Sequence, residues 1–388
     1  MSSSDAIKVL IIGAGPFGLA IASDLRRRGL TATVLGEPMA FWKHNMPAGM
    51  FLRSGVDWHL DTGGTWTITR FLEASGRSAA NVQPFPLDVY VEYVNWFAAQ
   101  ASVDVVRAEV VSLDRAEDDQ RAFRIRFRNG ERITARRVVV AIGFANFAHV
   151  PAELTQRLPA GRFDHTCSAV RLEGMANDRC LIVGGRQSAF EWAALLAEAG
   201  ASAVHVAYRH ETPRFAESDW SWAGQLVQRF VDEPGWFRRL SAPDREALGR
   251  RFWEEGRLKL EPWLEPRIRA GGVRLWPRRE VVAAHQTSSE AIAVTFQSGE
   301  SIVVDRVILA TGYRPNVRGV PFLAAGNLLP LLETSNDCPT LDDRMQSSVP
   351  GLYFTSLLAT NDFGPFFAFT VSARAAATLI GQDLAVTN

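Results

Sequence analysis

The sequence is poor in the residues that form covalent cross-links and metal sites. Its only three cysteines, Cys167, Cys180 and Cys338, form no C-x-x-C pair and show no metal-ligand spacing. A disulfide scaffold and a redox-active cysteine pair are therefore not expected, and this cysteine usage is compatible with a reducing cytoplasm. The sequence also contains no H-E-x-x-H motif, no paired metal ligands and no Ser/His/Asp set, so we expect neither a metal site nor a serine nucleophile.

The chain also lacks an excess of charge and long hydrophobic runs. Lys and Arg together number 42, as do Asp and Glu, so the formal net charge is zero and no field favours nucleic acid or anionic lipid. No apolar run approaches the roughly 18 residues of a transmembrane helix. The first residues, MSSSDA, lack the basic and apolar regions of a signal peptide. We therefore expect a cytoplasmic protein without a nucleic-acid or membrane partner; its oligomeric state stays open.

What the sequence does contain is an internal repeat. Residues 9–30 align without a gap on residues 180–201, and residues 127–144 align on residues 296–313. Each copy predicts a buried strand, a glycine-rich turn and a helix, followed later by a hairpin and a strand that ends in glycine. One such unit forms a βαβ dinucleotide site, so two units predict two dinucleotides in one chain. This arrangement favours electron transfer between the two ligands.

The repeat predicts an α/β fold with two Rossmann-like dinucleotide-binding domains that each carry an antiparallel β meander. At 388 residues, of which 47% are hydrophobic, the chain is large enough for two cores. We expect a discontinuous first domain, residues 1–165 and 305–388, with the second domain, residues 166–304, inserted in it. Residues 211–270 predict a helical insertion that holds five of the 11 tryptophans. This insertion forms either a satellite core or a lid over the substrate site.

The first candidate cofactor site is a G-x-G-x-x-G motif formed by Gly13, Gly15 and Gly18, between a predicted strand and a predicted helix. In such a motif the first glycine permits the tight turn, the second lets backbone N–H groups approach a pyrophosphate, and the third allows close helix–strand packing. Glu37 can accept hydrogen bonds from a ribose 2′-OH and would repel a 2′-phosphate, which favours FAD or NAD. The other candidate cofactor residues of this site are Pro16, Phe17 and Trp42.

The second candidate site departs from this pattern. Gly184, Gly185, Arg186 and Ala189 stand where the first copy has Gly13, Ala14, Gly15 and Gly18. An arginine in place of the second glycine should crowd a pyrophosphate unless its guanidinium points outward or itself contacts phosphate. Arg209 replaces the carboxylate of the first site, which favours NADPH, although NADH is possible. Further donors at the helix N-terminus are Gln187 and Ser188.

Three segments resemble the two-dinucleotide flavin monooxygenases, namely the flavin-containing monooxygenases and the lysine and ornithine N-hydroxylases. GAGPFGLA resembles their FAD fingerprint, and GGRQSAFEWA is similar to their NADPH fingerprint apart from Arg186. DRVILATGYRP, residues 305–315, is similar to their D-x-x-x-L-A-T-G-Y segment. Residues 161–166 match only the end of another signature of the group, and residues 363–370 resemble its flavin-contacting C-terminal stretch. The bacterial flavin urate hydroxylases are a possible subgroup.

The resemblance implies FAD in the first domain, NADPH in the second, and cofactor contacts from Thr311, Gly312, Asp362 and Phe363. It also implies that NADPH reduces the flavin, which reacts with O₂ to a C4a-hydroperoxide that hydroxylates a small molecule. The substrate is an amine nitrogen or a planar heteroaromatic compound such as urate.

Candidate catalytic residues lie in the polar and aromatic segment 42–61. Arg53, Asp57 and His59 can bind a polar substrate and manage a proton, or they can be held by ordinary loop hydrogen bonds. His165 can orient the nicotinamide dinucleotide or act as a structural hinge. Two other functions stay open: a flavin NAD(P)H dehydrogenase or oxidase without oxygen insertion, and a redox sensor with a degenerate nicotinamide site.

Overall fold

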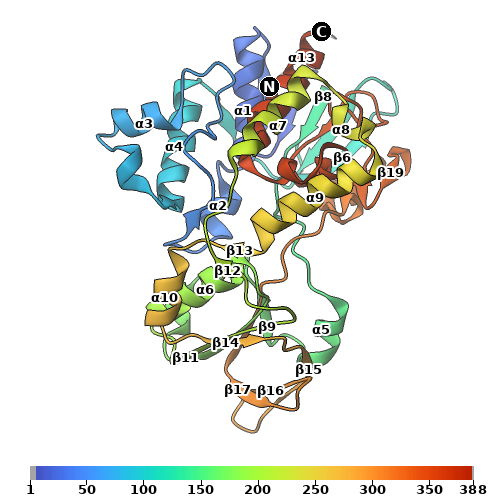
Figure 1. Ribbon diagram of the computed structural model, residues 1–388. Coiled ribbons are helices and arrows are strands. Elements are labelled where there is room, and N and C mark those ends of the chain that lie inside the picture. Colours follow the sequence, from blue (N-terminus) through green and yellow to red (C-terminus); the bar gives the residue numbers. More distant parts are fainter. Residues whose placement is uncertain (1–5, 387–388) are drawn as a thin grey trace.

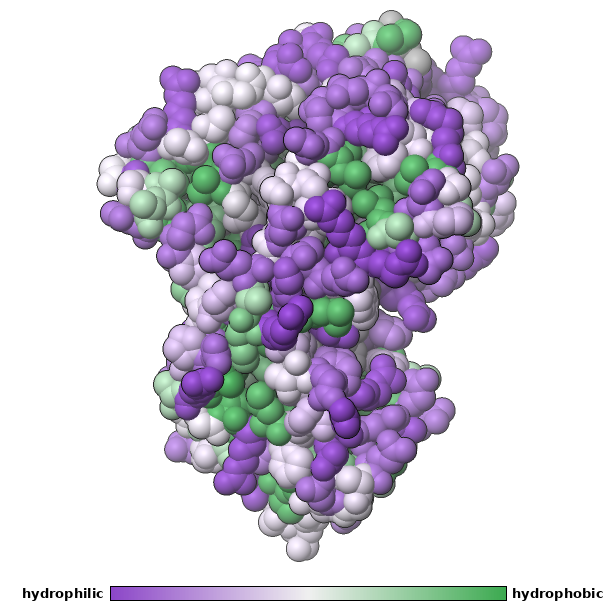
Figure 2. All heavy atoms as spheres, viewed as in Figure 1, coloured by the Kyte–Doolittle hydropathy of each residue, from purple (hydrophilic) through white to green (hydrophobic). Residues whose placement is uncertain are grey.

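The computed structural model describes residues 6–386, which form an upper and a lower lobe joined by a narrow waist (Figure 1). Each lobe is built on its own sheet with parallel central strands, and each lobe contains one copy of the repeat. In Figure 2 the surface narrows between the lobes, and the waist is mostly hydrophilic on the face shown. The α/β fold with two Rossmann-like units that the sequence predicts is confirmed.

The sheet of the upper lobe has seven strands, with the first strand of the chain between its parallel neighbours β2 and β8. The order is β5 (Val105–Val106), β2 (Ala32–Leu35), β1 (Ile7–Ile12), β8 (Arg132–Val140), β7 (Phe123–Phe127) and β6 (Val110–Arg115), and β21 (Leu352–Phe354) pairs with the second half of β8. Strands β6, β7 and β8 form the antiparallel meander that the Asn129-Gly130 turn predicts. Val9 to Ile12 are buried, as expected for a central parallel strand.

The lower lobe repeats the parallel part of this arrangement, and its meander forms a separate sheet. Its five parallel strands are β14 (Arg274–Pro277), β11 (Ala203–Tyr208), β10 (Arg179–Val183), β18 (Arg306–Leu309) and β9 (Phe163–His165), in that order. The second meander contains β15 (Val281–Gln286), β16 (Ile292–Phe296) and β17 (Ser301–Val304). Strand β10 therefore lies between β11 and β18 just as β1 lies between β2 and β8, which confirms the repeat.

Helices cover both sheets. In the upper lobe α1 (Pro16–Arg27) packs against α13 (Ala373–Val386), whereas in the lower lobe α6 (Gln187–Glu198) packs against α10 (Leu264–Ala270). The other elements of the two lobes are α2 (Ala40–His44), α3 (Ile68–Ala74), α4 (Leu87–Gln100), α5 (Ala152–Arg157), α11 (Pro321–Ala324), α12 (Thr360–Phe363), β3 (Phe51–Leu52), β4 (Phe85–Pro86), β19 (Thr334–Ser335) and β20 (Cys338–Pro339).

The helical insertion joins the two lobes. It leaves and re-enters the lower lobe through the paired strands β12 (Arg214–Phe215) and β13 (Lys259–Leu260). Its helices α7 (Ser221–Asp232), α8 (Trp236–Arg239) and α9 (Ala242–Arg257) nevertheless lie against the upper lobe (Figure 1). The buried Phe230 ring contacts Phe363 and Phe367 of the upper lobe at centroid distances of 5.7 and 4.9 Å. The insertion thus shares an aromatic core with the upper lobe, and the domain boundaries drawn from the sequence stay a prediction.

The described part of the chain contains no disulfide and no helix long and apolar enough to cross a membrane. Cys180 and Cys338 are buried, and Cys167 is half-buried. Within residues 6–386 no cluster of His, Cys, Asp and Glu is arranged to hold a metal ion.

Candidate functional site: two nucleotide cradles

The first cradle is the turn between β1 and α1, and two of its glycines are required by close backbone contacts. Gly13 has a φ of +116°, and a Cβ at this position would overlap the carbonyl oxygen of Ala141. A Cβ at Gly18 would overlap the carbonyl oxygen of Gly13, so the helix can approach the strand only because residue 18 has no side chain. Gly15 differs from both, because a Cβ there would meet no atom within 4 Å. The turn therefore leaves open space in front of Gly15.

A cavity of about 330 Å³ adjoins this turn. It lies between the cradle, the end of β2, helix α2 and the segment after β8. Of the predicted cofactor residues it is lined by Gly13, Gly15, Pro16, Phe17, Glu37 and Trp42. Gly18 lies behind the turn, where it packs the helix on the strand. The structure thus brings the first predicted site together, with the segments 108–110, 141–146 and 321–322 as lining that the sequence did not single out.

The first cradle fits an adenine dinucleotide that carries a free ribose hydroxyl. No side chain caps the N-terminus of α1 at Gly15, so its backbone N–H groups are available to a phosphate. Glu37 lies at the end of β2 beside the cavity, and its carboxylate contacts His44 Nε2 at 3.0 Å. This hydrogen bond is the main cause that lowers the pKa of Glu37. Glu37 is therefore a carboxylate that can accept hydrogen bonds from a ribose.

The second cradle is built on the same backbone plan with different side chains. Gly184 has a φ of +147°, and a Cβ there would overlap the carbonyl oxygen of Ala310, the counterpart of Ala141. Ala189 is buried in the place of Gly18. The Arg186 side chain does not fill the turn, because its Nη1 donates to the carbonyl oxygen of Arg257 at 2.7 Å. The guanidinium points away from the turn and toward the end of α9.

The other predicted residues of the second cradle surround this turn. Arg209 follows β11 and is exposed, and within residues 6–386 its side chain has no hydrogen bond or ion pair. Gln187 Oε1 accepts a hydrogen bond from the Glu261 backbone N–H at 3.1 Å. Ser188 is exposed, whereas Gly185 is buried and packs against Tyr208. The free Arg209 guanidinium at the end of β11 fits the 2′-phosphate of NADPH.

The two halves of the repeat meet at the waist. Phe144 and Tyr313, which occupy equivalent positions of the two copies, contact each other with a centroid distance of 5.0 Å. His165 packs on Tyr313, and its Nε2 donates to the carbonyl oxygen of Gly312 at 3.0 Å. Burial lowers the pKa of His165. These contacts fix the crossing segments and place Gly312 at the junction, outside the first cavity.

Thr311 also contributes to this junction. Its hydroxyl donates to the carbonyl oxygen of His149, so its polar group is engaged within the protein. A contact of Thr311 or Gly312 with a cofactor stays a prediction.

The structure does not bring the three candidate catalytic residues together. Arg53 forms an ion pair of 2.7 Å with Glu261 and donates to Ser218 Oγ at 2.6 Å, so it links β3 to the insertion. His59 Nε2 accepts a hydrogen bond of 3.0 Å from Arg374. Burial, followed by the Arg374 charge, lowers the pKa of His59 to about 4. Asp57 is exposed, and none of Arg53, Asp57 and His59 lines the first cavity. Their catalytic role stays a prediction.

Two candidates near the C-terminus also lie apart from this cavity. Asp362 Oδ2 accepts a hydrogen bond of 2.8 Å from the Leu341 backbone N–H. Phe363 is buried in the aromatic core that the insertion shares with the upper lobe. Both side chains have structural partners here, and their contact with a cofactor stays a prediction.

The sequence interpretation missed Glu191, a carboxyl on the buried face of α6. Its side chain is 1% exposed and accepts a hydrogen bond of 2.8 Å from the Phe51 backbone N–H, which belongs to the upper lobe. Burial raises the pKa of Glu191 to about 7, despite the opposing charges of Arg267 and Arg53. The signal in the sequence is a glutamate where the first copy has Ala20.

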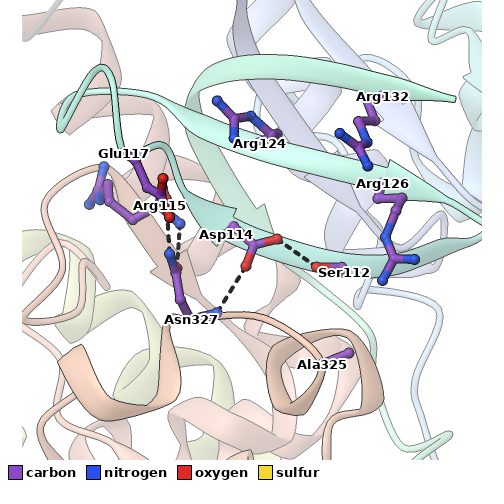
Figure 3. Close-up of a pocket in the computed structure, with 9 residues that line it drawn as sticks. All are labelled: Ser112, Asp114, Arg115, Glu117, Arg124, Arg126, Arg132, Ala325 and Asn327. Carbon is purple, nitrogen blue, oxygen red and sulfur yellow. Dashed lines mark hydrogen bonds between the residues drawn. The ribbon is translucent and has the colours of Figure 1, made fainter.

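A second cavity of about 320 Å³ lies on the meander of the upper lobe (Figure 3). Arg124, Arg126 and Arg132 project from one side, and Asn327 N–H donates to Asp114 at 3.0 Å on the other. None of its lining residues is a glycine, and none belongs to either cradle. We therefore assign no dinucleotide to it.

Comparisons with known proteins agree with the two-cradle architecture. A family model described as pyridine nucleotide-disulphide oxidoreductase matches residues 10–230, and a second model with the same description matches residues 247–355. The ornithine N-hydroxylase of Kutzneria sp. 744, solved with reduced FAD, NADP⁺ and L-ornithine, superposes with a TM-score of 0.80 at 16% identity. The superposition covers 98% of this chain and 99% of that chain, and this likeness shows the fold.

Two curated relatives are similar in sequence. The indole-3-pyruvate monooxygenase YUCCA1 of Oryza sativa subsp. japonica is 29% identical over 341 residues, which are 79% of this chain and 77% of that protein. The FAD-dependent urate hydroxylase of Xanthomonas campestris pv. campestris is 26% identical over 240 residues, which are 58% of this chain and 50% of that protein.

Substitution of Gly15 and Gly18 by alanine separates cofactor binding from folding. We expect Gly18→Ala to destabilise the apoprotein by about 1–3 kcal/mol, because its Cβ overlaps the Gly13 carbonyl. Gly15→Ala should leave the melting temperature of the apoprotein unchanged, because φ is −88° and the space is open, but should weaken FAD binding. Thermal unfolding of the apoproteins and flavin retention on a desalting column measure the two effects. Equal destabilisation by both substitutions would contradict this account.

The buried Glu191 predicts a pH dependence of stability. Its folded pKa of about 7 lies above the unfolded value of 4.5, so the unfolded state loses its proton first and stability falls as pH rises through this interval. Glu191→Gln keeps an acceptor for Phe51 but cannot ionise. We expect its free energy of unfolding to exceed that of the wild type by up to about 3 kcal/mol at pH 8, with no excess near pH 4.5.

Urea unfolding at a series of pH values measures this difference. Glu198→Gln on the same helix is the control, because Glu198 is exposed and pairs with Arg267. Parallel pH profiles of the wild type and Glu191→Gln would show that folding does not raise the pKa of Glu191.

Proposed function

Because the chain belongs to the pyridine nucleotide-disulphide oxidoreductase family, we propose that it is an FAD-dependent monooxygenase reduced by NADPH. One observation carries this proposal: two nucleotide cradles of opposite charge preference, marked by Glu37 and Arg209, stand in a single chain whose halves meet at the waist. A carboxylate favours a dinucleotide without a 2′-phosphate, and a free guanidinium favours one that has it. The pair of ligands that satisfies both is FAD and NADPH.

The cysteines argue against disulfide reduction, which the family description includes. Such a reaction requires two neighbouring thiols that exchange electrons with the flavin. The three cysteines of this chain lie in separate segments, Cys167 in the turn after β9, Cys180 in β10 and Cys338 in β20, and they form no disulfide. Burial raises the pKa of Cys180 to about 12 and that of Cys338 to about 11, so neither thiol is an effective nucleophile at neutral pH. Molecular oxygen is therefore the acceptor that we propose.

The residues of the chain bind and orient the reactants. The Gly13 turn and the open N-terminus of α1 would hold the pyrophosphate of FAD, and Glu37 its adenosine ribose. Arg209 would hold the 2′-phosphate of NADPH. The chemistry that bound FAD supplies is acceptance of a hydride from NADPH and, once reduced, activation of O₂. His59 is neutral at pH 7, so we do not propose it as a proton donor in this chemistry. Arg53 is paired with Glu261, so we do not propose it as a substrate-binding residue.

For the substrate we propose a small molecule with a planar ring or an amine nitrogen. The two curated relatives are named for planar compounds, indole-3-pyruvate and urate, whereas the structural neighbour is named for ornithine. The aromatic insertion beside the upper lobe favours the planar class.

Anaerobic mixing of the purified flavoprotein with NADPH tests the reductive half of this function. We expect the yellow colour of the oxidised flavin to bleach, and aerobic turnover with the right substrate to consume one NADPH and one O₂ for each hydroxylated product formed. A panel of purines, indoles, amines and sulfides, with peroxide quantified in parallel, identifies the substrate. Flavin that stays oxidised would indicate a sensor, and consumption of NADPH to peroxide alone with every compound would indicate an oxidase.

The choice of NADPH over NADH is tested at Arg209. Arg209→Ala should raise the KM for NADPH about tenfold or more, because a charge-assisted phosphate contact is lost, and should leave the KM for NADH unchanged. Arg274→Ala is the matched control, since Arg274 is an exposed arginine at the opposite end of the neighbouring strand β14. An equal effect on both nucleotides would argue against a 2′-phosphate contact.

A further inference from the structure

The insertion places a second arginine beside the second cradle. Helix α9 runs across the upper lobe to the waist, and its last residue, Arg257, lies where the chain returns to the lower lobe (Figure 1). The Arg257 carbonyl accepts the hydrogen bond from Arg186, and the Arg186 guanidinium lies 5.0 Å from the centre of the Trp253 ring, one turn earlier. A carbonyl and an indole thus set the direction in which Arg186 points.

The positive charge at this place has no acidic partner. The Arg257 side chain is exposed, and within residues 6–386 it forms no hydrogen bond or ion pair. Desolvation lowers the pKa of Arg186. Desolvation and the charges of Arg53 and Arg186 lower the pKa of Arg257. Desolvation, followed by the charges of Arg186 and Arg209, lowers the pKa of His210. Glu261 pairs with Arg53, but within residues 6–386 no carboxylate pairs with Arg186, Arg209 or Arg257, so a bound anion would stabilise these three charges.

The position of this charge matches that of a dinucleotide phosphate. Arg186 directly precedes α6, and no side chain caps the N-terminus of that helix. The equivalent residue of the first cradle, Gly15, faces open space beside the cavity. A long side chain at this point can therefore leave the turn and approach a phosphate from the outer side. In this orientation the Arg186 side chain does not crowd the pyrophosphate, as the sequence alone suggested it would.

We propose that Arg186 and Arg257 together bind the diphosphate of the nicotinamide dinucleotide, so that the helical insertion forms one wall of the second cradle. This inference rests on the proposed function, because it requires a nicotinamide dinucleotide as ligand. Arg209 binds the 2′-phosphate at the end of β11, and the two other arginines bind the phosphates that NADPH and NADH share. The insertion then contributes to cofactor binding as well as to the aromatic core of the upper lobe.

Calorimetric titration of the oxidised holoprotein with NADP⁺ and with NAD⁺ tests the assignment without turnover. We expect Arg186→Gly and Arg257→Gln each to raise the Kd of both nucleotides about tenfold or more, and by the same factor. The Arg257 variant keeps the backbone carbonyl that holds Arg186, so it changes only the free guanidinium. Arg250→Gln on α9, whose arginine pairs with Glu246, is the control and should change neither Kd.

ADP and adenosine are the fragment probes. Both substitutions should weaken ADP and spare adenosine, because only ADP carries the diphosphate. Unchanged binding by Arg186→Gly would show that the arginine does not bind the ligand, and tighter binding would show that it obstructs the cradle. Weakening of NADP⁺ alone would move both arginines to the 2′-phosphate. Each of these results overturns the proposal. If the wild-type holoprotein binds neither nucleotide, the proposed function is overturned as well. This outcome is distinguishable because the wild type then gives no binding heat with either nucleotide, before any variant is measured.

Discussion

The contact between the first glycine of each cradle and the carbonyl group at the end of the neighbouring strand determines the geometry of the protein. Gly13 lies against Ala141, and Gly184 lies against Ala310, in both cases too closely for a side chain. This approach turns the chain sharply from strand into helix and leaves the N-terminus of the helix facing outward. It also fixes the direction of the chain after the neighbouring strand, which is β8 in one half and β18 in the other. The residues that follow include Phe144 after β8 and Tyr313 after β18. These two residues contact each other, so the two turns contribute to the arrangement of the lobes together with the packing of the insertion.

Local sequence was sufficient to predict the parts of the structure that depend on short-range geometry. The glycine turns, the central strands and the meanders follow from residue type and spacing, and they form as predicted. The lining of the first cavity follows for the same reason, since Gly13 to Phe17 and Glu37 flank consecutive elements of one βαβ unit. The repeat could also have identified segment 141–146 as cavity lining, because its counterpart 310–315 belongs to a motif that resembles the flavin monooxygenases.

Contacts between residues far apart in the chain could not be predicted. In the sequence alone Arg53 resembles a substrate-binding residue. In the structure it pairs with the carboxylate of Glu261, which lies 208 positions further along the chain. Burial, followed by the charge of Arg374 from the last helix, lowers the pKa of His59. The insertion begins and ends in the lower lobe, yet Phe230 packs on Phe363 of the upper lobe. In each case the partner is chosen by the tertiary packing, and neither composition nor periodicity of the local segment specifies it.

The two cradles show how one backbone plan can serve a retained and an exchanged ligand. The first adjoins a cavity lined by Pro16, Phe17 and Trp42 and uses a carboxylate, so apolar burial can contribute most of its affinity. The second is surrounded by the half-buried Arg186 and the exposed Arg209 and Arg257, where affinity comes from charged contacts that water and salt weaken. A prosthetic group must outlast many turnovers, whereas a reductant must leave after each one. Burial in the upper lobe and exposed charge at the waist are the physical properties that these two requirements demand.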